Sequence, residues 1–83
     1  MSYEVELART AERLRQLSEA RLRAREQAFA ELLSVMTDRP VPRLHPRAWA
    51  DQMTVIGREV VGQDQPAVSE RLITFRRSFD LFP

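Results

Sequence analysis

The sequence contains no cysteine, no lysine and only one histidine, His45, among its 83 residues. Without cysteine, neither a disulfide framework nor a thiolate metal site can form, and one histidine excludes a site built from several imidazole ligands. No apolar run approaches the ~20 residues that a membrane-spanning helix needs. The N-terminal segment MSYEVELART lacks the basic start and apolar core of a signal peptide. We therefore expect a cytoplasmic protein with no metal, no cofactor and no membrane association.

Charge of either sign is abundant but balanced, with 13 basic and 12 acidic residues and a formal net charge of +1. This balance is too even for a dedicated nucleic-acid binder or a polybasic membrane anchor. Every basic residue is arginine, which indicates either codon bias in a GC-rich bacterial or phage genome or specific recognition of carboxylate or phosphate by guanidinium groups. The arginines are scattered along the chain, and this favours codon bias.

Glycine and proline are missing from the first 36 residues, which predicts one long helix over residues 2–36. Ser2 is a suitable N-cap, and Glu4 and Glu6 place negative charge in the first turn, where the helix dipole favours it. At 1.5 Å per residue this helix would be about 50 Å long.

Three prolines then interrupt the chain, and they predict a stiff, extended connector over residues 37–46. A second helix is expected over residues 47–62, because Trp49, Met53, Ile56 and Val60 recur at helical spacing. A strand around MTVIGREVV is the alternative, since valine and isoleucine favour β-structure.

A third helix is expected over residues 66–81, with an apolar stripe of Val68, Leu72, Phe75, Phe79 and Phe82. The chain is therefore predicted to form a single all-α domain over residues 1–83, with one long helix and two shorter ones. A three-helix bundle and an extended helical hairpin both fit this pattern. In either case the two short helices cover only about half of the long one, so self-association is expected to complete the fold.

The stretch SEARLRAREQ, residues 18–27, interrupts the apolar seam of the long helix with arginines. The apolar face is narrow before it and wide after it, which indicates a boundary between a projecting half and a half packed in the core. We expect the projecting half to bind a partner, with a homodimer as the simplest case. The residues expected to form this partner-binding surface are Leu7, Leu14, Leu17, Arg21 and Arg25.

Arg21 and Arg25 have three interpretations in this seam. Their aliphatic stems can flank an apolar surface while the guanidinium groups stay in water. They can also pair with a partner's carboxylates and set its register, or bind an anion such as phosphate.

No arrangement of residues typical of a catalytic site is visible in the sequence. His45 lies in the connector without a neighbouring serine, cysteine or aspartate in a known spacing, and the carboxylates are dispersed along helices. We therefore expect a protein that is not an enzyme.

The C-terminal stretch SFDLF, residues 78–82, resembles the short pentapeptide with which bacterial proteins bind the replication sliding clamp. Asp80, Leu81 and Phe82 match that pattern, Phe79 replaces its leucine, and Ser78 replaces its usual glutamine. The resemblance implies a docking role for Phe79, Asp80, Leu81 and Phe82, whereas the helical stripe places Phe79 and Phe82 in the core.

Two functions follow from these patterns. The first is a helical protein–protein interaction module, such as an adaptor, an assembly factor, an accessory subunit or an anti-regulator, which acts through an amphipathic helix face. The alternative is a nucleic-acid-associated or DNA-replication accessory protein, which acts through its arginines or through the clamp-binding-like tail.

Overall fold

A computed structural model describes residues 2–60 and 65–81 of the chain, and within these residues every regular element is helical. The elements in chain order are α1 (Tyr3–Gln16), α2 (Glu19–Arg23), α3 (Glu26–Met36), the 3₁₀ turn η1 (Pro46–Ala48), α4 (Trp49–Arg58) and α5 (Gln65–Leu81). The all-α class expected from the sequence is confirmed. In the part of the chain that the structure describes, no helix is long and apolar enough to cross a membrane.

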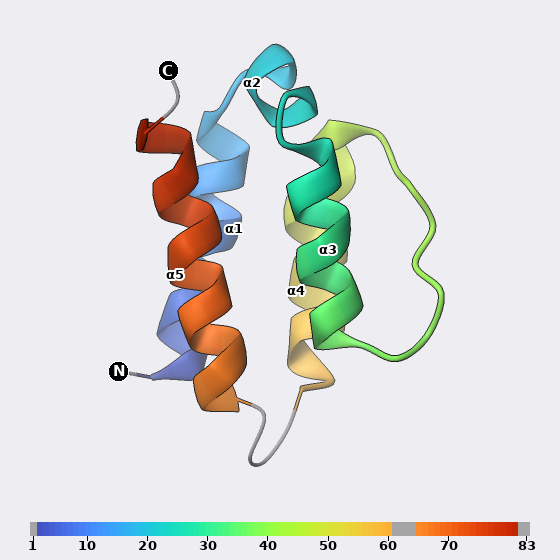
Figure 1. Cartoon of the computed structure of the whole chain (residues 1–83), viewed down its shortest axis with the longest axis vertical. Helices are drawn as coiled ribbons and strands as arrows, with labels where there is room; N and C mark the ends of the chain where they lie inside the picture. The colour runs from blue at the N-terminus through green and yellow to red at the C-terminus, as the bar shows by residue number, and fades with distance from the viewer. Residues whose placement is uncertain (1, 61–64, 82–83) are drawn as a thin grey trace.

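The four longer helices pack side by side (Figure 1). Helix α1 contacts both α4 and α5, and α3 contacts the same two helices. Helices α1 and α5 run in one direction, whereas α3 and α4 run in the opposite direction (Figure 1). The layout is thus a four-helix bundle and not the expected three-helix arrangement, because the segment predicted as one long helix supplies two of its members.

The prediction of a continuous helix over residues 2–36 was wrong. Leu17 and Ser18 both adopt extended backbone conformations, with ψ angles of 147° and 157°. The Ser18 side chain then accepts a hydrogen bond from the Arg21 backbone N–H at 3.3 Å and caps α2. A second interruption at Arg25 (φ −115°, ψ 21°) separates α2 from α3. The boundary indicated by SEARLRAREQ is therefore a reversal of the chain.

This reversal is favoured because it lets α1 and α3 share one core. The longest dimension of the protein is 34 Å, whereas a continuous helix over this segment would extend about 50 Å. With the chain folded back, the apolar faces of all four helices meet in one cluster, whose largest members include Leu7, Leu14, Leu32, Leu33, Phe29, Trp49, Met53, Leu72, Phe75 and Phe79.

Because α3 and α4 are parallel, the chain must return along the full length of the bundle between them. Residues 37–45, which we call the strap, make this return along the outside of α3 and α4 (Figure 1). An extended chain gains about 3 Å per residue, so nine residues exceed the roughly 16 Å length of α3. Residues 37–45 form no helix or strand, as expected of the connector predicted from the prolines, and Pro46 begins η1.

Helix α5 agrees closely with the predicted bounds, whereas α4 is shorter than the helix predicted over residues 47–62 and does not include residues 59 and 60. Helix α4 follows η1 and ends at Arg58, while Val60 is buried just beyond it, and residues 61 and 62 of the predicted segment lie outside the described part. This helix also decides against the strand alternative for residues 53–58. Helix α5 buries Val68, Leu72, Phe75 and Phe79 as expected, whereas Phe82 lies outside the described residues.

We expect the Leu14→Asp substitution to unfold the whole protein, because Leu14 is only 3% exposed and a carboxylate there would be buried without a partner. Val55→Asp is the matched control, since Val55 is 61% exposed. Far-UV circular dichroism and thermal denaturation should show loss of helix for Leu14→Asp only. A helical Leu14→Asp protein would contradict the packing of α1 described above.

Candidate functional site: a groove beneath the strap

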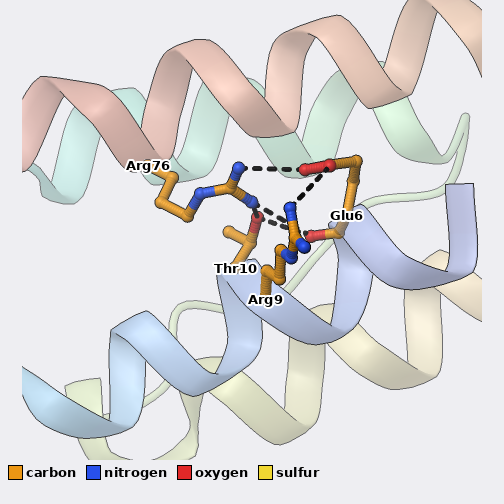
Figure 2. A network of polar contacts seen from close by, with 4 residues as sticks. All are labelled: Glu6, Arg9, Thr10 and Arg76. Carbon is orange, nitrogen blue, oxygen red and sulfur yellow. Dashed lines mark hydrogen bonds and ion pairs between the residues drawn. The ribbon is translucent and has the colours of Figure 1, made fainter. Parts of the chain in front are cut away.

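A buried carboxylate, that of Glu6, is the first candidate for a chemical role, because active sites often contain such groups. Its side chain is 0% exposed and lies between α1 and α5. Arg76 Nη2 donates to Glu6 Oε1 at 2.9 Å, and Arg76 Nη1 donates to Thr10 Oγ1 at 3.2 Å (Figure 2). Glu6 Oε2 lies 4.0 Å from Nη1 of Arg9.

These contacts indicate a structural role for Glu6. Thr10 Oγ1 donates to the Glu6 carbonyl at 2.8 Å, and the Arg76 guanidinium spans the carboxylate and the threonine hydroxyl (Figure 2). The network therefore links the first two turns of α1 to α5 through charge-assisted hydrogen bonds, which fix the register of the two helices.

A second buried polar contact joins α1 to α4. The Tyr3 hydroxyl donates to the Gly57 carbonyl at 2.6 Å. Burial raises the pKa of the Tyr3 hydroxyl, because the phenolate is disfavoured away from water. A side chain at Gly57 would meet the Leu7 methyl groups at 2.5 and 2.8 Å, so glycine allows the two helices to approach this closely.

An apolar groove lies between the strap and the helices α3 and α4. Its volume is about 230 Å³. The Phe29 and Trp49 rings stack with centroids 4.3 Å apart and an interplanar angle of 9°, and both rings line the groove together with Leu33. Val41 and Leu44 line it from the strap, and Leu44 is 41% exposed. The groove therefore borders the aromatic part of the core, where Phe29 and Trp49 are 3% and 2% exposed.

Polar groups at the edge of this groove fall into two sets. Gln52 Nε2 donates to the Pro42 carbonyl at 2.8 Å, and Trp49 Nε1 donates to the Leu44 carbonyl at 3.2 Å. These two bonds attach the strap to α4. Arg39 and Arg43 are exposed on the strap, and no described residue forms an ion pair with either guanidinium.

His45 fixes the end of the strap. Its Nε2 lies 3.2 Å from Glu19 Oε1, and its Nδ1 accepts a hydrogen bond from the Arg47 backbone N–H at 3.1 Å. A hydrogen bond from Arg23 lowers the pKa of Glu19, and the charges of Arg23, His45 and Arg47 act in the same direction. His45 thus acts as a helix cap and as a link to α2, and it has two local partners.

The leucines expected to bind a partner lie in or against the monomer's own core. Leu7 and Leu14 are 6% and 3% exposed, and Leu17 is partly buried against the same cluster. The expectation of a projecting, uncovered helix half was therefore wrong. The reason is the chain reversal after Leu17, which places α4 and α5 against α1.

The two arginines occupy different positions. Arg21 donates from Nη2 to the Phe79 carbonyl in the last turn of α5, where carbonyls lack intrahelical partners and the dipole favours a cation. Arg25 is partly buried at the N-cap of α3 and lines a separate groove between α3 and α5. Arg21 thus makes an internal contact that none of the three sequence interpretations named.

The clamp-binding-like tail is integrated into the fold only in part. Phe79 is 2% exposed, and Asp80 Oδ1 accepts a hydrogen bond from Arg13 Nη2 at 2.6 Å. Leu81 is 71% exposed, and Phe82 lies outside the described residues. Docking through Phe79 would require the last turns of α5 to leave the core.

Sequence reasoning missed the groove because it treated the strap as a connector only. The available signal was the placement of Val41 and Leu44 between prolines, close in sequence to the single tryptophan. Apolar residues in a proline-rich connector indicate a segment that packs against the domain. Comparisons of this chain with protein-family models, curated proteins and solved structures found no match.

Replacing Arg76 with methionine should cost about 3–5 kcal/mol of unfolding free energy, because the buried Glu6 carboxylate would lose the guanidinium group that is hydrogen-bonded to it. The double variant Glu6→Met, Arg76→Met should recover most of this loss, since an apolar pair needs no compensation. Urea denaturation of both single variants and the double variant gives the coupling energy. If the losses of unfolding free energy in the two single variants add up in the double variant, the pairing of the two side chains is contradicted.

Replacing Tyr3 with phenylalanine should cost about 1 kcal/mol at neutral pH through the lost hydrogen bond to Gly57. The raised pKa of Tyr3 makes a second effect testable. The contribution of the protonated Tyr3 hydroxyl to the free energy of unfolding is present in full below the unfolded-state pKa near 10. It is lost as the pH rises towards the higher folded-state pKa. Denaturation between pH 8 and 11 should therefore show a steeper alkaline loss of stability for the wild type than for Tyr3→Phe.

Proposed function

We propose that this chain is a non-enzymatic helical interaction module that binds another protein at the groove beneath the strap. An adaptor, an assembly factor, an accessory subunit or an anti-regulator would each act in this way. The observation that supports the proposal most directly is the open apolar groove over the Phe29–Trp49 ring pair. Concave apolar sites with a few polar groups at their edge are the usual form of a binding site.

The charged groups at this groove fit binding better than catalysis. Arg39 and Arg43 are exposed to solvent, and Glu26 is partly exposed at the start of α3. General acid–base chemistry favours groups whose pKa is shifted by burial or by a close partner. Solvent-facing arginines around an apolar floor serve instead to orient a bound segment.

A different protein is the favoured partner over a second copy of this chain. Self-association was expected because Leu7 and Leu14 were placed on an uncovered face, and both now lie in the core of the monomer. The groove beneath the strap offers an apolar surface that the described residues leave open.

A substitution that fills the groove provides the test. Ala30 is partly exposed and lines the groove, so Ala30→Trp should block it without removing core contacts. Ala8→Trp is the matched control, because Ala8 is exposed on α1 and lines none of the described grooves.

Affinity purification from the native host should recover at least one protein with the wild type and with Ala8→Trp that is lost with Ala30→Trp. Circular dichroism should show the same helix content for all three proteins. Recovery of the same proteins by all three would contradict binding at this groove.

A further inference from the structure

We infer that the segment bound at this groove is an extended acidic peptide that inserts one apolar side chain beneath the strap. This inference rests on the proposed function and specifies its partner. It draws on three separate properties of the groove, namely its size, its charge and the main chain of the strap.

The size of the groove limits what can enter it. An apolar cavity of about 150 Å³ accommodates benzene, whereas sites for drug-sized ligands span about 300–1,000 Å³. At about 230 Å³ the groove fits a single aromatic or branched aliphatic side chain. A whole helix face with several anchoring residues would not fit, so an amphipathic helix is a poor candidate.

The charge at the groove favours an acidic segment. Two arginines and one glutamate line it, which gives a net charge of +1 over the lining residues. Neither Arg39 nor Arg43 pairs with a carboxylate among the described residues, unlike Arg13, Arg15, Arg23 and Arg76. A partner with carboxylates on either side of its apolar residue would supply the missing counter-charges.

The main chain of the strap favours an extended partner. Among the described residues, no hydrogen bond is formed by the backbone N–H groups of Val41, Arg43 and Leu44. The carbonyls of Val41 and Arg43 are likewise without donors, whereas those of Pro42 and Leu44 are bonded to α4. Residues 41 and 43 stand two apart, so in an extended chain their polar groups face the same edge. An added strand pairs with such an edge through its own main chain.

A peptide-binding experiment monitored through the fluorescence of Trp49 tests this inference. Trp49 is the only tryptophan and lines the groove, so an inserted ring should change its emission. The probe is the synthetic peptide Ac-Glu-Glu-Val-Phe-Glu-Glu-amide. Its controls are a peptide with lysine in place of every glutamate and a peptide with alanine in place of valine and phenylalanine.

We expect the acidic peptide to bind at least tenfold more tightly than either control peptide. Arg39→Glu and Arg43→Glu should each weaken its binding about tenfold, which corresponds to roughly 1.4 kcal/mol. Arg77→Glu is the control for the change in net charge, because Arg77 is exposed on α5 and lines none of the described grooves. Two further peptides carry methyl groups on alternate backbone nitrogens, one on the odd-numbered residues and the other on the even-numbered residues. One of the two should no longer bind, because only one edge of the peptide pairs with the strap.

Each remaining outcome counts against the inference. Equal binding of the acidic and basic peptides, or an equal loss with Arg77→Glu, would overturn the assignment of charge. Unchanged binding of both methylated peptides would overturn the strand geometry.

The failure of the inference can be told apart from the failure of the proposed function. If no peptide binds at millimolar concentration while Ala30→Trp still loses a host protein, the partner is not an extended acidic segment, and the groove remains the binding site. If no peptide binds and Ala30→Trp recovers the same host proteins as the wild type, both the inference and the proposed function are wrong.

Discussion

The fold depends on the loss of helical conformation at Leu17 and Ser18. Two extended residues there turn a segment rich in helix-forming residues into two members of one bundle. The aromatic contacts of the core follow from this reversal, because α3 must lie beside α4 and α5 for the Phe29, Trp49 and Phe75 rings to meet. The free energy lost by breaking the helix is small compared with the free energy gained when the shared core buries its apolar area.

The sequence predicted the helical class and both C-terminal helices, because each of these helices has its own periodic apolar stripe. The Val68–Leu72–Phe75–Phe79 pattern could be read directly, and all four side chains are buried. The break after Leu17 could not be predicted in the same way, since its residues favour helix and only Ser18 hints at a cap. Tertiary packing overrides propensity at this point, and periodicity within one segment contains no information about packing between segments.

The same limit explains which site residues were misplaced. Leu7 and Leu14 were correctly identified as members of an apolar face, but the partner of that face is the rest of the chain. Glu6 and Arg76 are separated by 70 positions, so no local pattern pairs them. Arg39 and Arg43 were visible only as connector residues, because a groove exists only once the strap lies against α3 and α4.

The pairing of α1 with α5 also bears on how the protein reaches its native state. Helices α1 and α5 lie side by side (Figure 1), and the contacts of Glu6 with Arg76 and of Arg13 with Asp80 span 70 and 67 positions. Helical bundles usually fold fast because most of their contacts are local, whereas contacts between distant segments require the closure of long loops first. In this bundle α1 packs against both α4 and α5, so its contacts with α5 cannot form until residues 65–81 have been added to the chain. A ribosome-bound chain that ends before α5 would therefore leave exposed the part of the α1 apolar face that α5 covers, and the bundle can close only after α5 has been synthesised.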